Sequence, residues 1–181
     1  MKVDRKGWTM WSIEEIAKLI KDVPDFPKKG ILFKDITPVL SHHEAFVSLT
    51  RQFVRAIDPS VTHLAAIESR GFILGAAIAQ HMNVGFLPVR KPGKLPRETY
   101  AQSYQLEYGE DTLEIHKDDL KAGDRVAIID DVLATGGTAA ATEALIKKTG
   151  ATVLESHFLM EIEFLRGRDR LEAPVKSFMK V

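Results

Sequence analysis

Residues 126–138 read VAIIDDVLATGGT and join an apolar run, two acids and a turn of small residues. The run Val126–Ile129 is mostly β-branched, which is typical of a central parallel strand buried on both faces. After the turn, Ala139–Lys148 is rich in Ala, Glu, Leu and Lys and is followed by Thr149-Gly150, so it predicts a helix with a stop. The order of strand, acids, turn and helix indicates an α/β fold, with the two acids where the strand ends.

The turn between this strand and helix has almost no side-chain bulk and comprises Ala134, Thr135, Gly136, Gly137 and Thr138. Backbone N–H groups at the start of the helix can therefore surround a phosphate, and the two hydroxyls can add hydrogen bonds. Asp130 and Asp131 would repel that anion, so we expect them to bind sugar hydroxyls or a metal-bound water. The alternative is a tight turn in which one Asp is a solvated cap, but the whole pattern favours a site for a phosphorylated sugar. Neither GxxxxGK[ST] nor GxGxxG after a strand occurs, which excludes the familiar kinase and dinucleotide loops.

Length and composition indicate one globular domain. The 181 residues are 45% hydrophobic, which is enough for one core. A formal net charge of zero gives no global field that would attract nucleic acid or an anionic membrane, and the absence of Cys excludes thiol catalysis, disulfides and cysteine metal sites. Met1–Trp11 is too charged for a signal peptide, and the apolar runs are too short to span a bilayer. We therefore expect a cytoplasmic protein without nucleic-acid or membrane partners.

Two basic loops are expected at the same sheet edge as the acids. A second strand-helix-strand unit is predicted over His63–Ile67, Phe72–Met82 and Val84–Val89. Arg70 follows its first strand, and Lys91 and Lys94 follow its second. In a parallel sheet these loops lie at the carboxyl edge, where their cations can hold an anion near the phosphate turn. The alternative is that they are ordinary surface cations; we interpret them as a clamp for pyrophosphate.

The remaining chain carries weaker signals. Residues 95–120 form a long excursion with a predicted hairpin across Gly109, which is either a lid over the site or a structural hairpin. The tail Glu161–Val181 is mixed and charged, and no element is predicted there. Other predicted elements are a helix after the capping box Ser12–Glu15, a strand at Ile31–Phe33, a helix over His42–Ile57 and a strand over Ala151–Met160.

Residues 126–138 resemble the phosphoribosyl pyrophosphate (PRPP) motif of the type I phosphoribosyltransferases. Four further segments, residues 26–38, 68–72, 90–96 and 103–109, are similar to the adenine-specific members of that family and follow in order along the chain. The resemblance implies an α/β fold with a central, mainly parallel sheet flanked by helices, in one domain over residues 1–181. It also implies a small N-terminal hood at residues 22–40 and a flexible catalytic loop at residues 95–116.

The resemblance assigns the purine to the hood. Phe33 would stack on adenine, the backbone near Ile31 would read its polar edge, and Leu159 would cover its other face. The alternative for Phe33 is a plain core residue, and this alternative is stronger for Leu159, because any apolar residue on that strand would pack equally well. Lys34 stands where many members carry Arg, and it lacks the planar fork needed for a bidentate bond to the loop glutamate, Glu107.

The resemblance assigns the sugar and pyrophosphate to the sheet edge. Asp130 and Asp131 would hold the ribose hydroxyls, and the turn Ala134–Thr138 would take the 5-phosphate. Arg90 could reach a neighbour's site, because the family is usually dimeric. The implied catalytic residues are Glu107, Arg70, Asp130 and Asp131; the other implied substrate contacts are Tyr108, Lys91 and Lys94.

The implied reaction is displacement of pyrophosphate from PRPP by nitrogen 9 of adenine, which yields AMP. Mg2+ would be held mainly by substrate oxygens and water, so no dedicated protein metal site is expected. Two alternatives remain: transfer to another base (hypoxanthine, guanine, xanthine or orotate), and a regulator that senses PRPP without catalysis. The segment before the hood can hold only one helix and shows no basic recognition face, which disfavours a nucleic-acid-binding regulator.

Overall fold

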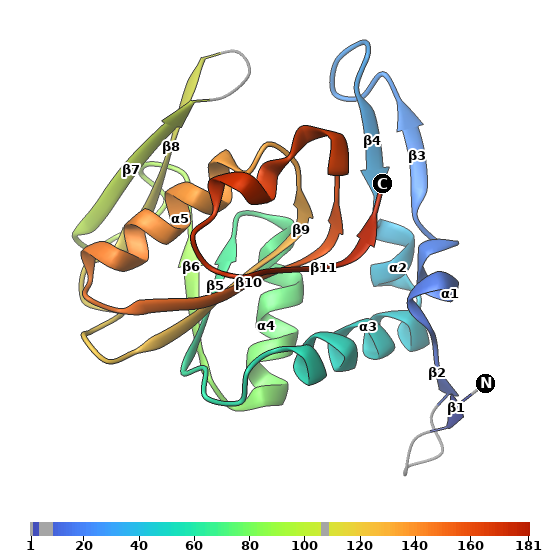
Figure 1. Ribbon diagram of the computed structural model, residues 1–181, viewed down its shortest axis with the longest axis horizontal. Helices are drawn as coiled ribbons and strands as arrows, with labels where there is room; N and C mark the ends of the chain where they lie inside the picture. The colour runs from blue at the N-terminus through green and yellow to red at the C-terminus, as the bar shows by residue number, and fades with distance from the viewer. Residues whose placement is uncertain (1, 4–8, 106–108) are drawn as a thin grey trace. The chain divides into compact units, whose positions relative to one another are not determined.

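A computed structural model describes residues 2–3, 9–105 and 109–181 (Figure 1). The chain divides into two compact units, Met1–Phe53 and Val54–Val181. The single domain expected from the sequence stays a prediction. Within the described ranges, no helix is long and apolar enough to cross a membrane.

The first unit consists of short elements around a few buried residues. The capping box is confirmed, because Ser12 Oγ accepts from Glu15 N–H at 3.2 Å and Glu15 Oε2 accepts from Ser12 N–H at 2.7 Å. The predicted strand near Ile31 is also confirmed, one residue later and paired with an antiparallel strand that the sequence analysis missed. The elements are β1 (Lys2–Val3), β2 (Thr9–Met10), α1 (Ile13–Ala17), β3 (Lys21–Pro24), β4 (Leu32–Asp35), α2 (Thr37–Ser41) and α3 (His43–Ala56), which continues into the second unit.

The second unit is built on a five-stranded sheet with the order β11-β10-β9-β5-β6 (Figure 1). Every neighbouring pair is parallel, so the expected parallel sheet is confirmed. The strands are β5 (His63–Ile67), β6 (Gly85–Val89), β9 (Arg125–Leu133), β10 (Thr152–Glu161) and β11 (Val175–Lys180). The predicted position of the acids was wrong in one respect: β9 continues to Leu133, so Asp130 and Asp131 lie within the strand rather than after it.

Helices cover both faces of this sheet. An ideal Cβ on Gly75 of α4 (Arg70–Met82) would lie 2.6 Å from Ala66 Cβ, so α4 packs on the face that carries Ala66. Ala65 and Ile67 point to the opposite face, because side chains alternate along a strand. There they join a buried cluster with Leu145 and other residues of α5 (Gly137–Lys148). Two covered faces explain why β5 and the first part of β9 are apolar without alternation.

The predicted hairpin is confirmed and is longer than expected. It consists of β7 (Thr99–Gln105) and β8 (Glu110–His116), which pair antiparallel and project beyond α5 in Figure 1. Leu113 and Ile115 of β8 are buried in the same cluster as α5. The base of this arm is therefore part of the core.

The C-terminal tail is ordered by the sheet. Two short 3-10 helices, η1 (Glu163–Leu165) and η2 (Gly167–Arg170), follow β10 and lead to β11. β11 pairs parallel with β10 and forms the edge strand. This strand was not predicted, because its sequence mixes apolar, polar and charged residues without regular alternation and it lies at the sheet edge, where its residues stay partly exposed.

Candidate functional site

The sheet reverses its direction of winding between β5 and β9. The chain passes from β5 outward to β6, and from β9 outward to β10 on the other side. In an open parallel sheet the loops diverge at such a point and leave a crevice beyond the carboxyl ends of the two strands. Arg70 follows β5, and Asp130 and Asp131 lie near the end of β9, so the fold brings these predicted residues to one edge.

Arg70 contacts the acid pair directly. Its Nε lies 3.0 Å from Asp131 Oδ2, and the Asp131 side chain is only 4% exposed. Asp130 Oδ1 accepts a hydrogen bond from the Asp131 N–H at 2.9 Å. Gly71 permits the close approach of α4, because an ideal Cβ there would lie 3.0 Å from Asp130 Oδ1.

The ionised form of the acid pair is electrostatically disfavoured. Burial raises the pKa of Asp130 well above its usual range, and the charge of Asp131 raises it further. Burial also raises the pKa of Asp131, although the Arg70 guanidinium opposes this. Acids with a raised pKa next to a cation, at the edge where the loops diverge, are typical of functional sites.

The predicted phosphate turn lines an open hollow beside this pair. Gly136 caps α5 with a φ of 80°, a left-handed conformation that favours glycine. Gly137 is the exception among the turn residues, because it faces Tyr104 of the hairpin, whose ring carbon would lie 3.0 Å from an ideal Cβ there. The lining residues are Asp130, Val132, Leu133, Ala134, Thr135, Gly136, Thr138, Ala139 and Phe158.

A glutamate that was not predicted to have a role joins the two basic segments. Glu68 Oε2 lies 3.2 Å from Arg90 Nε and accepts from the Lys91 N–H at 3.1 Å. Burial acts to raise the pKa of Glu68, but these partners outweigh it and the pKa is lowered. Arg90 also donates to the carbonyl oxygen of Lys94 at 3.1 Å. Glu68 therefore fixes the backbone that presents the two lysines; its place directly after a buried strand was the available signal.

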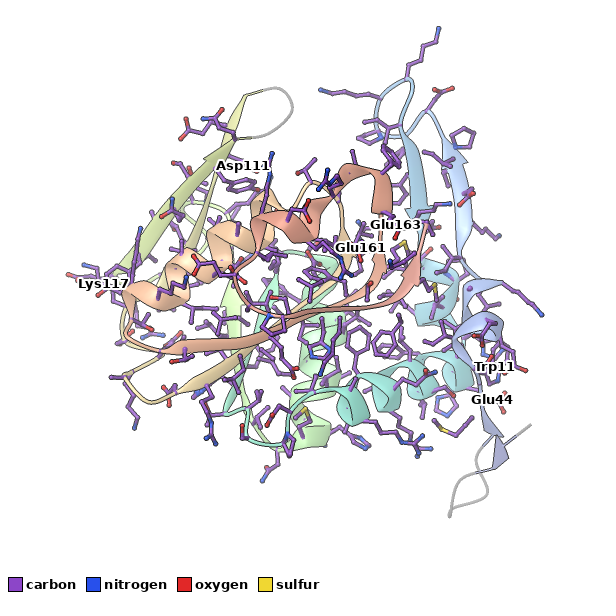
Figure 2. The ribbon with its side chains drawn as sticks, viewed as in Figure 1. Trp11, Glu44, Asp111, Lys117, Glu161 and Glu163 are labelled. Carbon is purple, nitrogen blue, oxygen red and sulfur yellow. The ribbon has the colours of Figure 1, made fainter. Side chains whose placement is uncertain are left out.

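The hairpin contacts the same basic loop through its free end. Lys91 Nζ lies 3.1 Å from Asp111 Oδ2, and the Tyr104 hydroxyl donates to the same oxygen at 3.4 Å. Asp111 lies toward the tip of the arm, whereas Lys117 lies at its base (Figure 2). No pattern in the sequence assigned Asp111 or Tyr104 to the site. The predicted loop residues Glu107 and Tyr108 lie outside the described residues.

The predicted purine-binding residues are distributed over both units. Ile31 is 45% exposed and precedes β4, whereas Phe33 lies on β4 and packs edge-on against Phe26 with 5.0 Å between ring centroids. Lys34 Nζ contacts Asp22 Oδ1 at 2.7 Å across the β3–β4 pair. Leu159 is fully buried on β10. Their roles toward a base stay predictions.

The chain is similar to known proteins over most of its length. The family model described as phosphoribosyl transferase domain matches residues 40–181. An adenine phosphoribosyltransferase of a Nocardioides species is 55% identical over 175 residues, which cover 93% of this chain and 95% of that protein. The crystal structure of adenine phosphoribosyltransferase from Thermoanaerobacter pseudethanolicus matches with a TM-score of 0.92 at 49% identity, covering 94% of this chain and 100% of that one. Adenine phosphoribosyltransferase from Saccharomyces cerevisiae, complexed with D-2,5-dideoxy-2,5-imino-altritol 1,6-bisphosphate and adenine, matches with a TM-score of 0.89 at 40% identity, covering 92% of this chain and 97% of that one.

Proposed function

This chain belongs to the adenine phosphoribosyltransferases, a family of the phosphoribosyl transferase domain, and we propose that it makes AMP and pyrophosphate from PRPP and adenine, a purine-salvage reaction. One observation carries the proposal. Arg70 lies 3.0 Å from the buried Asp131 at the winding reversal of the sheet, and the hollow lined by Thr135, Gly136 and Thr138 adjoins the acid pair. A cation, two acids and a phosphate-sized turn in this order suit a sugar that carries phosphate at one end and pyrophosphate at the other.

We assign the parts of PRPP by charge. The backbone N–H groups and hydroxyls of the turn would bind the 5-phosphate at the start of α5. Asp130 and Asp131 would accept hydrogen bonds from the ribose hydroxyls and favour positive charge that develops on the sugar ring. Arg70, Lys91 and Lys94 would neutralise the pyrophosphate.

In the proposed reaction the bond from C1 of the sugar to the pyrophosphate oxygen breaks, and its electron pair leaves with pyrophosphate. Nitrogen 9 of adenine forms the new bond to C1 and loses its proton. We assign that proton to Glu107, a general-base role worth on the order of 100-fold or more in rate. Phe33 would stack on the base. Ile31 and Leu159 would be further contacts of the base, and Lys34 and Tyr108 would lie near it.

We propose that the reaction uses Mg2+ held mainly by PRPP oxygens and water. Among the described residues, no group of three or more His, Cys, Asp or Glu side chains could surround a metal ion, but Asp130 and Asp131 offer oxygen atoms that suit a hydrated Mg2+. When bound with PRPP, Mg2+ would neutralise the leaving pyrophosphate. We further propose that the protein works in the cytoplasm as a homodimer in which Arg90 reaches the neighbouring site; light scattering on the purified protein tests the dimer.

The test is direct assay of nucleotide formation. The protein is incubated with Mg2+, PRPP and one of adenine, hypoxanthine, guanine, xanthine or orotate, and the nucleotide is detected by chromatography. We expect AMP, with adenine preferred over hypoxanthine by at least about tenfold in kcat/KM, because a buried group that accepts from the 6-amino group would face an oxygen instead. If another base is used as well as adenine, the protein is still a phosphoribosyltransferase, but its specificity differs from the proposal. PRPP binding without any nucleotide would favour the sensor.

A further inference from the structure

The segment between β10 and β11 forms the rear support of the phosphate turn. An ideal Cβ on Gly136 would overlap the carbonyl oxygen of Gly167 and lie 2.9 Å from its carbonyl carbon. Conversely, an ideal Cβ on Gly167 would overlap the carbonyl oxygen of Ala134 and lie 2.9 Å from the Gly136 nitrogen. Gly167 is buried and begins η2. Two stretches about thirty residues apart in the sequence therefore touch backbone to backbone, with no room for a side chain between them.

An ion pair between a buried glutamate and a partly exposed arginine holds this supporting segment in place. Glu161, at the carboxyl end of β10, is 1% exposed (Figure 2). Its carboxylate accepts from Arg168 Nε at 2.7 Å and from Arg168 NH2 at 2.5 Å, a bidentate arrangement, and from Ser177 Oγ at 2.8 Å. The Arg168 hydrogen bonds hold the pKa of Glu161 below its usual range. The residue next to Gly167 is thus tied to the end of a central strand.

The same end of β10 is tied to the start of the turn. Glu161 pairs with Leu133, the last residue of β9, and the Ile162 N–H donates to the Leu133 carbonyl oxygen at 2.9 Å. The turn continues the chain from Leu133, and the supporting segment continues it from Glu161. They meet again at Gly136 and Gly167, which closes a ring of contacts around the turn.

We propose that Glu161, Arg168 and Gly167 are positioning residues for the 5-phosphate: they hold the turn in the conformation in which its N–H groups converge on the anion. The inference rests on the proposed function, because it concerns the phosphate of PRPP and AMP. In this role the side chains of Glu161 and Arg168 do not touch the ligand, and Gly167 has no side chain. A displaced support lets the turn relax, and misplacement of a binding group by about 1 Å can cost on the order of 100-fold.

The test separates phosphate binding from the rest of the site. The variants are Gly167→Ala, Arg168→Ala and Arg168→Lys, and Arg170→Ala is the matched control, because it removes one exposed arginine from the same 3-10 helix. The measurements are the KM values of PRPP and adenine, the affinities for AMP and for adenosine by calorimetry, and thermal unfolding. The ratio of AMP to adenosine affinity reports the phosphate alone, and a general loss of stability would not change it selectively.

We expect Gly167→Ala and Arg168→Ala to raise the KM of PRPP and to lower the AMP-to-adenosine ratio by about tenfold or more, which equals about 1.4 kcal/mol, the size of one hydrogen bond to a charged group. The KM of adenine should change less than about twofold, and Arg168→Lys should fall between Arg168→Ala and the wild type, because lysine keeps the charge but not the fork.

A wild-type ratio in Gly167→Ala overturns the inference, whether or not the Arg168 variants fold. The same loss in Arg170→Ala would also overturn it, because the effect would then follow from charge rather than from the support. Absence of AMP formation by the wild type defeats the proposed function before any variant is compared. Normal wild-type turnover with unchanged variants defeats only the positioning role.

Discussion

Truncation of Arg70 is the most informative perturbation of the site. In the structure Arg70 Nε lies 3.0 Å from Asp131 Oδ2, and the side chains are 32% and 4% exposed, respectively. Removing one partner of a fully buried ion pair costs about 3–5 kcal/mol. Water can replace part of the field of a side chain that is one-third exposed, so we expect Arg70→Ala to lose about 1–3 kcal/mol of unfolding free energy. For a chain of this size the melting temperature falls by about 2–4 °C per kcal/mol.

The same substitution should affect one substrate selectively. A charge-assisted hydrogen bond to pyrophosphate is worth about 1.5–3 kcal/mol, which corresponds to roughly a 10- to 150-fold rise in the KM of PRPP. Adenine lies outside the reach of this cation in the proposed arrangement, so its KM should stay within about twofold. A lower affinity for adenine with unchanged handling of PRPP would place Arg70 in the wrong half of the site.

The stability loss should depend on pH with a predictable sign. Arg70 opposes the burial that raises the pKa of Asp131, so its removal raises that pKa further. The variant is therefore destabilised most at pH values at which Asp131 is ionised in the wild type. In the variant, Asp131 must then either keep its charge without Arg70 or take up a proton. The difference shrinks as the pH falls and both proteins carry a protonated Asp131.

Chemical unfolding at about pH 8 and about pH 5, together with a double-mutant cycle with Asp131→Asn, measures this coupling. We expect Arg70→Ala to cost at least about 1 kcal/mol less in the Asp131→Asn background, because no buried charge is then left behind. Equal losses at both pH values, together with additivity in the cycle, would refute the reasoning.

Three further predictions concern other parts of the site. The double variant Asp130→Asn, Asp131→Asn should lower kcat by about 100-fold or more, which kinetics measures. It should also raise the melting temperature near neutral pH, which calorimetry measures. Burial raises the pKa values of both acids, so at a pH above these values the ionised pair destabilises the folded state. Asp111→Asn should free Lys91 for pyrophosphate and lower the KM of PRPP by up to about fivefold, since partly exposed pairs contribute about 0.2–1 kcal/mol; a raised KM would contradict this. Phe33→Ala should lower kcat/KM for adenine, because the variant loses a stacking energy of about 1–3 kcal/mol. Unchanged adenine kinetics would show that Phe33 does not stack on the base.

Most of the second unit could be predicted because its signals are local. Val126–Ile129 and His63–Ile67 are apolar without alternation, and the structure places both inside a sheet covered on two faces. The stop at Thr149-Gly150 marks the end of α5, which begins at Gly137, two residues before the predicted start. The parallel arrangement then followed from the alternation of strands and helices.

Other elements could not be predicted, because a local residue pointed elsewhere or because another strand creates them. β3 ends at Pro24, and a proline at a strand end removes no needed donor, yet in the sequence it indicates a break. β11 forms a strand only because β10 supplies its hydrogen bonds. Asp130 and Asp131 belong to β9 because this part of β9 pairs with β10, where Asp130 lies opposite Phe158. The sequence does not indicate this pairing, because the local change from apolar to acidic residues suggests that the strand ends.

The phosphate turn illustrates how a motif and its support differ in visibility. Its own residues are contiguous, so spacing and residue type alone indicated an anion site. Its support comes from Gly167 and from the ion pair between Glu161 and Arg168. These residues lie about thirty positions later, in the stretch where the sequence predicted no element. A glycine that must accept another backbone at contact distance looks the same in sequence as a glycine in any loop. Substitutions in the supporting segment should therefore reproduce the effects of substitutions in the turn itself, because both determine the same positions of the N–H groups around the phosphate.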